Sequence, residues 1–103
     1  MNLNKLMKQA QKMQEQMAKT QAELEEKTVE VSAAGGKVKV TANGAGDVLS
    51  IKIDKEIVDP NDVDFLEEAV LSGVRRAIEQ GKGLAQSEMT KITGGLSLPG
   101  MGL

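Results

Sequence analysis

The chain has 103 residues, the size of one small domain. It contains no cysteine, histidine, tryptophan or tyrosine, which excludes disulfides, zinc–thiolate sites and histidine-based catalysis. Phe65 is the single aromatic residue, so recognition of single strands or RNA by base stacking is disfavoured. With 13 basic and 15 acidic residues the net charge is -2, and any binding to nucleic acid has to come from local clusters of positive charge.

The polar N-terminal segment predicts neither a signal peptide nor a membrane anchor. Its beginning, MNLNKLMKQAQKMQ, lacks the apolar core of a signal peptide. No run in the chain approaches the roughly 18 apolar residues of a membrane span. Together with the absence of cysteine, this predicts a soluble protein of the cytoplasm.

Residues 2–27 are predicted to form one long helix. Apolar side chains recur every seven positions, and most other positions are Lys, Gln or Glu, which favour helices and remain in water. The methionines of this segment are interpreted as part of the apolar seam rather than as an adaptable binding surface. The seam consists of Leu3, Leu6, Ala10, Met13, Met17, Thr20 and Leu24.

The pattern then changes to the alternation of apolar and polar residues that is typical of strands. Residues 28–33 and 37–41 flank an Ala-Gly-Gly turn, and a second glycine turn at residues 43–47 leads into residues 48–54. The three segments predict an antiparallel meander with one apolar face. In the last strand, the side chains expected on that face are Leu49, Ile51 and Ile53.

A second helix is predicted from residue 60 to about residue 91. Asp59 can cap it, and Pro60 suits its first position. Gly73 and Gly81 lie on its apolar stripe and weaken the helix by about 1 kcal/mol each unless close packing compensates. The large members of the stripe are Val63, Leu66, Val70, Val74 and Leu84, together with Ala77, and the opposite half carries Arg75 and Arg76.

These elements predict an α+β fold in the order α-β-β-β-α, in a single domain of residues 1–93. Residues 94–103 hold four glycines, one proline and no charge, and predict a flexible tail. The first helix is about 38 Å long, whereas strands of about five to seven residues span about 17 to 23 Å. The helix must therefore protrude beyond the sheet, and because its seam then lacks support within the chain, an intertwined homodimer is expected.

Catalysis could use only carboxylates, lysines, arginines and hydroxyls. The acids of residues 23–26 and 59–68 lie where a solvated helix end and a helix N-terminus place acids for structural reasons. A carboxylate–metal hydrolase is therefore a remote alternative. The glycine turns match neither a phosphate loop nor a dinucleotide fingerprint. We predict a protein that is not an enzyme and has no cofactor, metal or small-molecule substrate.

Positive charge is concentrated in the first helix. Residues 1–22 contain one glutamate and four lysines, Lys5, Lys8, Lys12 and Lys19. This segment carries +3, and since the whole chain carries -2, the other 81 residues carry -5. Contacts between lysine and phosphate release counterions and give salt-dependent binding to duplex DNA without sequence preference. Composition alone favours the alternative, in which these lysines only solvate the helix.

A resemblance to the YbaB/EbfC family of nucleoid-associated proteins extends over essentially the whole chain. It is carried by four segments in this order: MKQAQKMQEQMAKTQAEL, VEVSAAGGKVKVTANGAGDVLSIKID, DPNDVDFLEEAV and GGLSLPGM. The resemblance implies an intertwined homodimer whose helices protrude like the arms of tweezers. It also implies a bacterial protein of the cytoplasm and nucleoid that binds DNA with little sequence preference, and a connection to recombination or replication proteins.

DNA contact in the family involves both helices. Carried over to this chain, the resemblance implies contacts by Lys5, Lys8, Lys12, Lys19, Arg75 and Arg76. Many relatives have Asn or an acidic residue in place of the two arginines, so DNA contact and a surface salt bridge both remain open for that pair.

The predicted function is a dimeric nucleoid-associated protein that binds the phosphates of double-stranded DNA and affects nucleoid organisation, gene expression or repair. The alternative is a protein-interaction adaptor, in which the seam around Leu6, Met13 and Met17 docks a helix of a partner.

Overall fold

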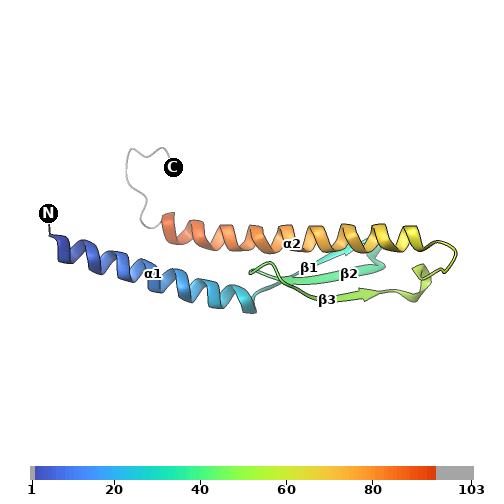
Figure 1. The fold of residues 1–103 in the computed structure, drawn as a ribbon, viewed down its shortest axis with the longest axis horizontal. Helices are drawn as coiled ribbons and strands as arrows, with labels where there is room; N and C mark the ends of the chain where they lie inside the picture. Colours follow the sequence, from blue (N-terminus) through green and yellow to red (C-terminus); the bar gives the residue numbers. More distant parts are fainter. Residues whose placement is uncertain (1, 95–103) are drawn as a thin grey trace.

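The computed structural model describes residues 2–94 and confirms the α-β-β-β-α order (Figure 1). The predicted tail lies outside the described residues, apart from Gly94 at the end of the second helix. The elements are α1 (Leu3–Glu26), β1 (Thr28–Ala33), β2 (Val38–Asn43), β3 (Val48–Ile53) and α2 (Val63–Gly94), with 3₁₀ turns at Ala34–Gly36 and Lys55–Ile57.

The strands form the predicted antiparallel meander in the order β1-β2-β3. Val40 lies opposite Val31 on one side and Ile51 on the other, so the three side chains share one face of the sheet. A β-bulge shifts the register between β2 and β3 at Thr41 and Ala42. The sheet therefore has one apolar face and one polar face, and both β1 and β3 are edge strands.

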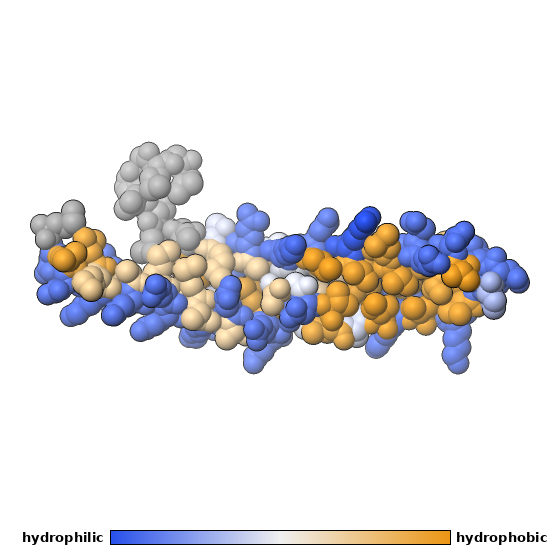
Figure 2. Space-filling view, viewed as in Figure 1, coloured by the Kyte–Doolittle hydropathy of each residue, from blue (hydrophilic) through white to orange (hydrophobic). Residues whose placement is uncertain are grey.

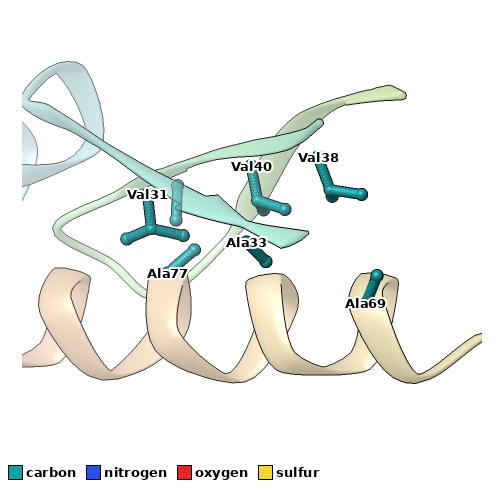
Figure 3. Packing of buried hydrophobic residues seen from close by; sticks show 7 residues of the cluster. Val31, Ala33, Val38, Val40, Ala69 and Ala77 are labelled. Carbon is teal, nitrogen blue, oxygen red and sulfur yellow. The ribbon is translucent and has the colours of Figure 1, made fainter. Parts of the chain in front are cut away.

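Helix α2 covers the apolar face of β1 and β2. Figure 3 shows four side chains of these strands, Val31, Ala33, Val38 and Val40, pointing toward Ala69 and Ala77 of α2. The helix approaches the sheet so closely that a Cβ at Gly73 would lie only 2.8 Å from Cγ2 of Val40. Close packing thus compensates for the low helix propensity of this glycine.

The large apolar residues of the α2 stripe are at most half-buried in the single chain. Of the predicted stripe only Ala77 and the glycines Gly73 and Gly81 are buried, whereas Val63 is exposed. A helix this close to a sheet has room only for glycine and alanine along the contact line, so larger side chains are displaced to its flanks. The half-buried members are Leu66, Val70, Val74 and Leu84.

Strand β3 is exposed along its whole length in the single chain. Ile51 and Ile53 do lie on the face of the sheet that α2 covers, because they are directly opposite Val40 and Val38. Helix α2 lies over β1 and β2, however, and leaves the β3 edge largely uncovered. As a result, Ile51 and Ile53 remain 43% and 39% exposed, and Leu49 at the bulge 52%.

Helix α2 begins at Val63 rather than at Pro60. The Asp59 carboxylate accepts a hydrogen bond from the N–H of Asn61 over 2.9 Å, and the Asp59 carbonyl accepts one from the N–H of Asp62 over 2.9 Å. These bonds close a separate turn before the helix. Asp59 therefore caps this turn and not α2.

Both helices project beyond the sheet. Figure 1 shows α1 running antiparallel to the C-terminal part of α2, and the two form an arm that extends away from the strands. The molecule is accordingly elongated, 71 × 27 × 16 Å. The protruding N-terminal helix is confirmed, but the sequence did not predict that α2 supports it. None of the helices in residues 2–94 is long and apolar enough to cross a membrane.

Candidate nucleic-acid interface

A turn between β2 and β3 holds the C-terminal end of α1. Asn43, only 4% exposed, donates a hydrogen bond from its side-chain amide to the carbonyl of Glu25 over 3.2 Å. Its side-chain oxygen accepts from the N–H groups of Ala45 and Asp47 over 3.0 and 2.9 Å. One buried side chain thus shapes the turn and ties it to one of the last carbonyls of the helix, which have no partner within it.

The neighbouring Gly44 completes this contact between the β2–β3 turn and the end of α1, which we call the joint. Its N–H donates to the carbonyls of Leu24 and Lys27 over 2.8 and 3.0 Å, and a Cβ at this position would lie 2.6 Å from Cδ2 of Leu24. Leu24 is the one buried residue of α1. The packing and hydrogen bonds at this joint determine the direction in which α1 leaves the sheet.

The four lysines predicted to bind DNA lie in one row along α1. At 3.6 residues per turn, the positions of this continuous helix fall within roughly 60° of its circumference. The row is about 21 Å long at a rise of about 1.5 Å per residue. It lies on the side of α1 away from the seam, whose members Met17 and Leu24 line the grooves between α1 and α2. The row consists of Lys5, Lys8, Lys12 and Lys19.

The lysine row forms no ion pair within residues 2–94. All four side chains are exposed, and none forms an ion pair or a side-chain hydrogen bond with a described residue. Glu15 is the single acid between the start of α1 and Lys19. Unpaired ammonium groups at a spacing of one to two helical turns are suited to contact with successive phosphates of a duplex.

Arg75 and Arg76 are not part of the lysine row. They lie on α2 above the sheet, before the segment of α2 that packs against α1. The guanidinium of Arg76 donates to the backbone carbonyl of Ser32 in β1. Neither arginine forms an ion pair within the described part of the chain. The six predicted residues therefore form two separate groups.

Helix α2 adds lysines to the arm that the sequence analysis did not assign. Lys82 is exposed beside the groove between the two helices, and no described residue pairs with it. Glu88 pairs with Lys27, the C-cap residue of α1, at 3.3 Å and with Lys91 at 3.4 Å, which links the two helices of the arm. The helical pattern of apolar residues that continues beyond Gly81 was the sequence signal that α2 extends through this segment. Only the packing shows that the segment lies beside α1.

An apolar groove lies between β3 and α2, on the flank that the core leaves open. Figure 2 shows hydrophobic surface over β3 and the adjoining half of α2. Exposed apolar surface of this kind on a small protein marks contact with another molecule. The groove is lined by Ile53, Leu66, Glu67, Val70, Leu71 and Val74.

The acidic residues do not assemble into a candidate metal site. Within residues 2–94 there is no group of three or more Asp, Glu, His or Cys side chains that could hold a metal ion. The acids of residues 59–68 belong to the turn before α2 and to its first turns.

Residues 1–96 match the YbaB/EbfC DNA-binding family. The chain belongs to this family. A nucleoid-associated protein of Clostridium novyi is 52% identical over 101 residues, which cover 98% of this chain and 89% of that protein. One of Moorella thermoacetica is 54% identical over 99 residues, covering 96% and 95% of the two chains. The family resemblance read from the sequence is therefore confirmed.

The fold of the YbaB/EbfC chain is also seen in a crystal structure. An uncharacterized protein from Helicobacter pylori superposes with a TM-score of 0.65 at 15% identity, over 76% of this chain and 90% of that one. At this identity the likeness shows the fold alone. The family and the nucleoid-associated relatives, all from bacteria, establish DNA as the class of ligand for which the charged surfaces have to be considered.

Proposed function

We propose that this chain is a homodimeric, non-enzymatic protein of the bacterial cytoplasm and nucleoid that binds the phosphates of duplex DNA with little sequence preference. The observation that carries the proposal is the lysine row of α1, Lys5, Lys8, Lys12 and Lys19, which is unpaired on a projecting arm.

The electrostatics of the chain favour backbone contact over base readout. The row carries four positive charges on a chain of net charge -2, so attraction to DNA is local to the arm. Lysines act as point charges for phosphates, whereas base edges are read by side chains that enter a groove. With a single aromatic residue, at position 65 in α2, the row has no neighbouring ring on which a base could stack.

A second copy of the chain is the proposed occupant of the apolar groove. Ile51, Ile53 and Leu71 are 43%, 39% and 42% exposed, so a single copy leaves this face to water. Strand β3 is also an edge with unpaired backbone groups. A symmetric contact here covers both features at once and gives the DNA two arms with two lysine rows.

Arg75 and Arg76 are proposed as a secondary DNA contact. Arg75 has no partner among the described residues, and the guanidinium of Arg76 has five N–H groups, of which the Ser32 carbonyl engages only part. Their distance from the lysine row in the fold makes them additions to the main surface rather than members of it.

A salt series of DNA binding tests the main proposal. The wild type should bind a duplex of arbitrary sequence at about 50 mM salt and weaken steeply by about 200 mM. Changing all four lysines of the row to Gln should abolish binding. The charge-matched control replaces Lys27, Lys37, Lys55 and Lys91 by Gln and should keep most of the salt dependence. Unchanged binding in the row variant would reject the assignment of the site.

The exposed seam of α1 favours a second candidate function, that of an adaptor. Leu3 and Leu6 of the seam are 69% and 44% exposed at the free end of the arm, and the neighbouring Met7 is 57% exposed. An amphipathic helix of a recombination or replication protein could cover them. A pull-down after nuclease treatment that depends on Leu6 and Met7, but not on the lysine row, would support the adaptor.

A further inference from the structure

The sheet face that points away from α2 carries only polar side chains in its two central rows. Because side chains alternate along each strand, this face is opposite to the one that holds Val38 and Val40. One row consists of Ser32, Lys39 and Lys52, and the next of Glu30, Thr41 and Ser50. We call these two rows the outer sheet face.

Two like charges lie side by side at the centre of the first row. Lys39 and Lys52 are directly opposite each other on β2 and β3, an arrangement that destabilises a sheet unless another group balances the charge. Neither forms an ion pair or hydrogen bond with a described residue. Asp54 and Glu56 follow β3 directly in the chain, but these acids pair with Lys37, at 3.5 and 2.6 Å.

The other residues of the outer sheet face add hydrogen-bond donors. Ser32 lies opposite Lys39, and Thr41 lies opposite Ser50 in the next row. Hydroxyl and ammonium donors are among the side-chain groups that bind phosphate oxygens in complexes with DNA. Glu30 is the single acid of the two rows, and it lies on the edge strand β1, across β2 from Ser50.

We propose that the outer sheet face is a second phosphate-binding surface for duplex DNA, centred on Lys39 and Lys52. The inference rests on the proposed function, because it extends the same backbone contact from the arm to the body. Lys39 pairs near the end of β1 that is distant from α1, so the two surfaces are separate along the molecule. At 71 Å the molecule spans about 21 base pairs at 3.4 Å each, which is enough for both surfaces to contact one duplex.

The test compares the Lys39→Gln/Lys52→Gln variant with the wild type on a duplex of about 40 base pairs, roughly twice the length of the molecule. The slope of log K against log salt should become shallower by about 1.8 for each bound chain, and low-salt affinity should fall by roughly tenfold or more. Lys39→Arg/Lys52→Arg should keep the wild-type slope. The control Lys55→Gln, which removes a lysine outside both surfaces, should change it much less. An unchanged slope, or an equal change in that control, would overturn the proposal.

A second measurement uses the unmodified protein. Lys39 and Lys52 should react more slowly with an amine-acylating reagent when the duplex is present, whereas Lys55, outside both surfaces, should not. Equal reactivity with and without DNA would also overturn the proposal. The variant in which all four lysines of the α1 row are Gln distinguishes failure of the outer sheet face from failure of the proposed function. If that variant loses DNA binding while Lys39→Gln/Lys52→Gln keeps the wild-type salt slope, only the outer sheet face is rejected. Absence of salt-dependent DNA binding by the wild type rejects both.

Discussion

Gly81 of α2 lies directly against the backbone carbonyl of Asn43, so close that a Cβ on the glycine would overlap the carbonyl oxygen. The same asparagine holds the end of α1 through its side chain. Helix α2 therefore passes the joint of the arm at the one point where only glycine fits. Gly83, two residues further along, has open space around the equivalent Cβ position.

The two glycines should respond in opposite directions to alanine. Gly83→Ala should raise the free energy of unfolding by about 0.5 to 1 kcal/mol, because alanine favours the helix and meets nothing. Gly81→Ala should lower it by about 1 to 3 kcal/mol, because the joint has to shift to admit a methyl group. Denaturant unfolding measures both. A stabilised Gly81→Ala variant would mean that the close approach to Asn43 is absent in solution.

Removal of the Asn43 side chain should loosen the arm. Asn43→Ala leaves the carbonyl of Glu25 and the N–H groups of Ala45 and Asp47 without their partner, at a cost of about 1 to 3 kcal/mol of stability. Amide hydrogen exchange at the C-terminal end of α1 should accelerate more than exchange in β2. Asn61→Ala, at an exposed position in the turn before α2, is the control and should change neither quantity.

A charge in the apolar groove should break the proposed dimer. Val70→Lys or Ile53→Lys places an ammonium group where a second copy would bury it, which is costly without a partner charge. Sedimentation should then report a monomer, whereas the wild type should sediment as a dimer. Val58→Lys, the same change at a valine that is 53% exposed and outside the groove, should leave the dimer intact. A dimeric Val70→Lys variant would place the interface elsewhere.

The ion pair within the arm should make stability depend on pH in the acid range. The pKa of Glu88 lies below its ordinary value of 4.5, chiefly because of its hydrogen bond with Lys27. A carboxylate whose pKa is lower in the folded state stabilises the fold above the unfolded pKa, and this contribution is lost as pH falls through the folded value. Unfolding of Glu88→Gln should therefore be less dependent on pH below 4.5 than that of the wild type.

The control for this prediction is Glu79→Gln, which removes an exposed acid of α2 that has no ion pair within the described residues. It should retain the wild-type pH dependence. High salt should reduce the effect of Glu88, because its partners Lys27 and Lys91 are exposed and their charges are screened. Identical pH profiles for Glu88→Gln and the wild type would show that the pair does not form in solution.

The amino-acid sequence by itself determined the order of elements and the lysine row. Helical and strand periods differ, and the changes of period near residues 27 and 60 mark the ends of the segments. The length of α1 relative to the strands was sufficient to predict that it protrudes. Lys5, Lys8, Lys12 and Lys19 could be assigned to one helix from local pattern alone, because neighbours on a helix are close in sequence.

Tertiary structure alone decided which apolar residues are buried and which charges meet. The sequence stripe of α2 included both Val70 and Ala77, but the distance between helix and sheet selects the small residue for the contact. The pairing of Lys39 with Lys52 depends on a strand register and a bulge that local alternation does not specify. The bond from Arg76 to Ser32 likewise joins residues 44 positions apart. Contacts between distant segments depend on packing geometry, which the period of a sequence does not contain.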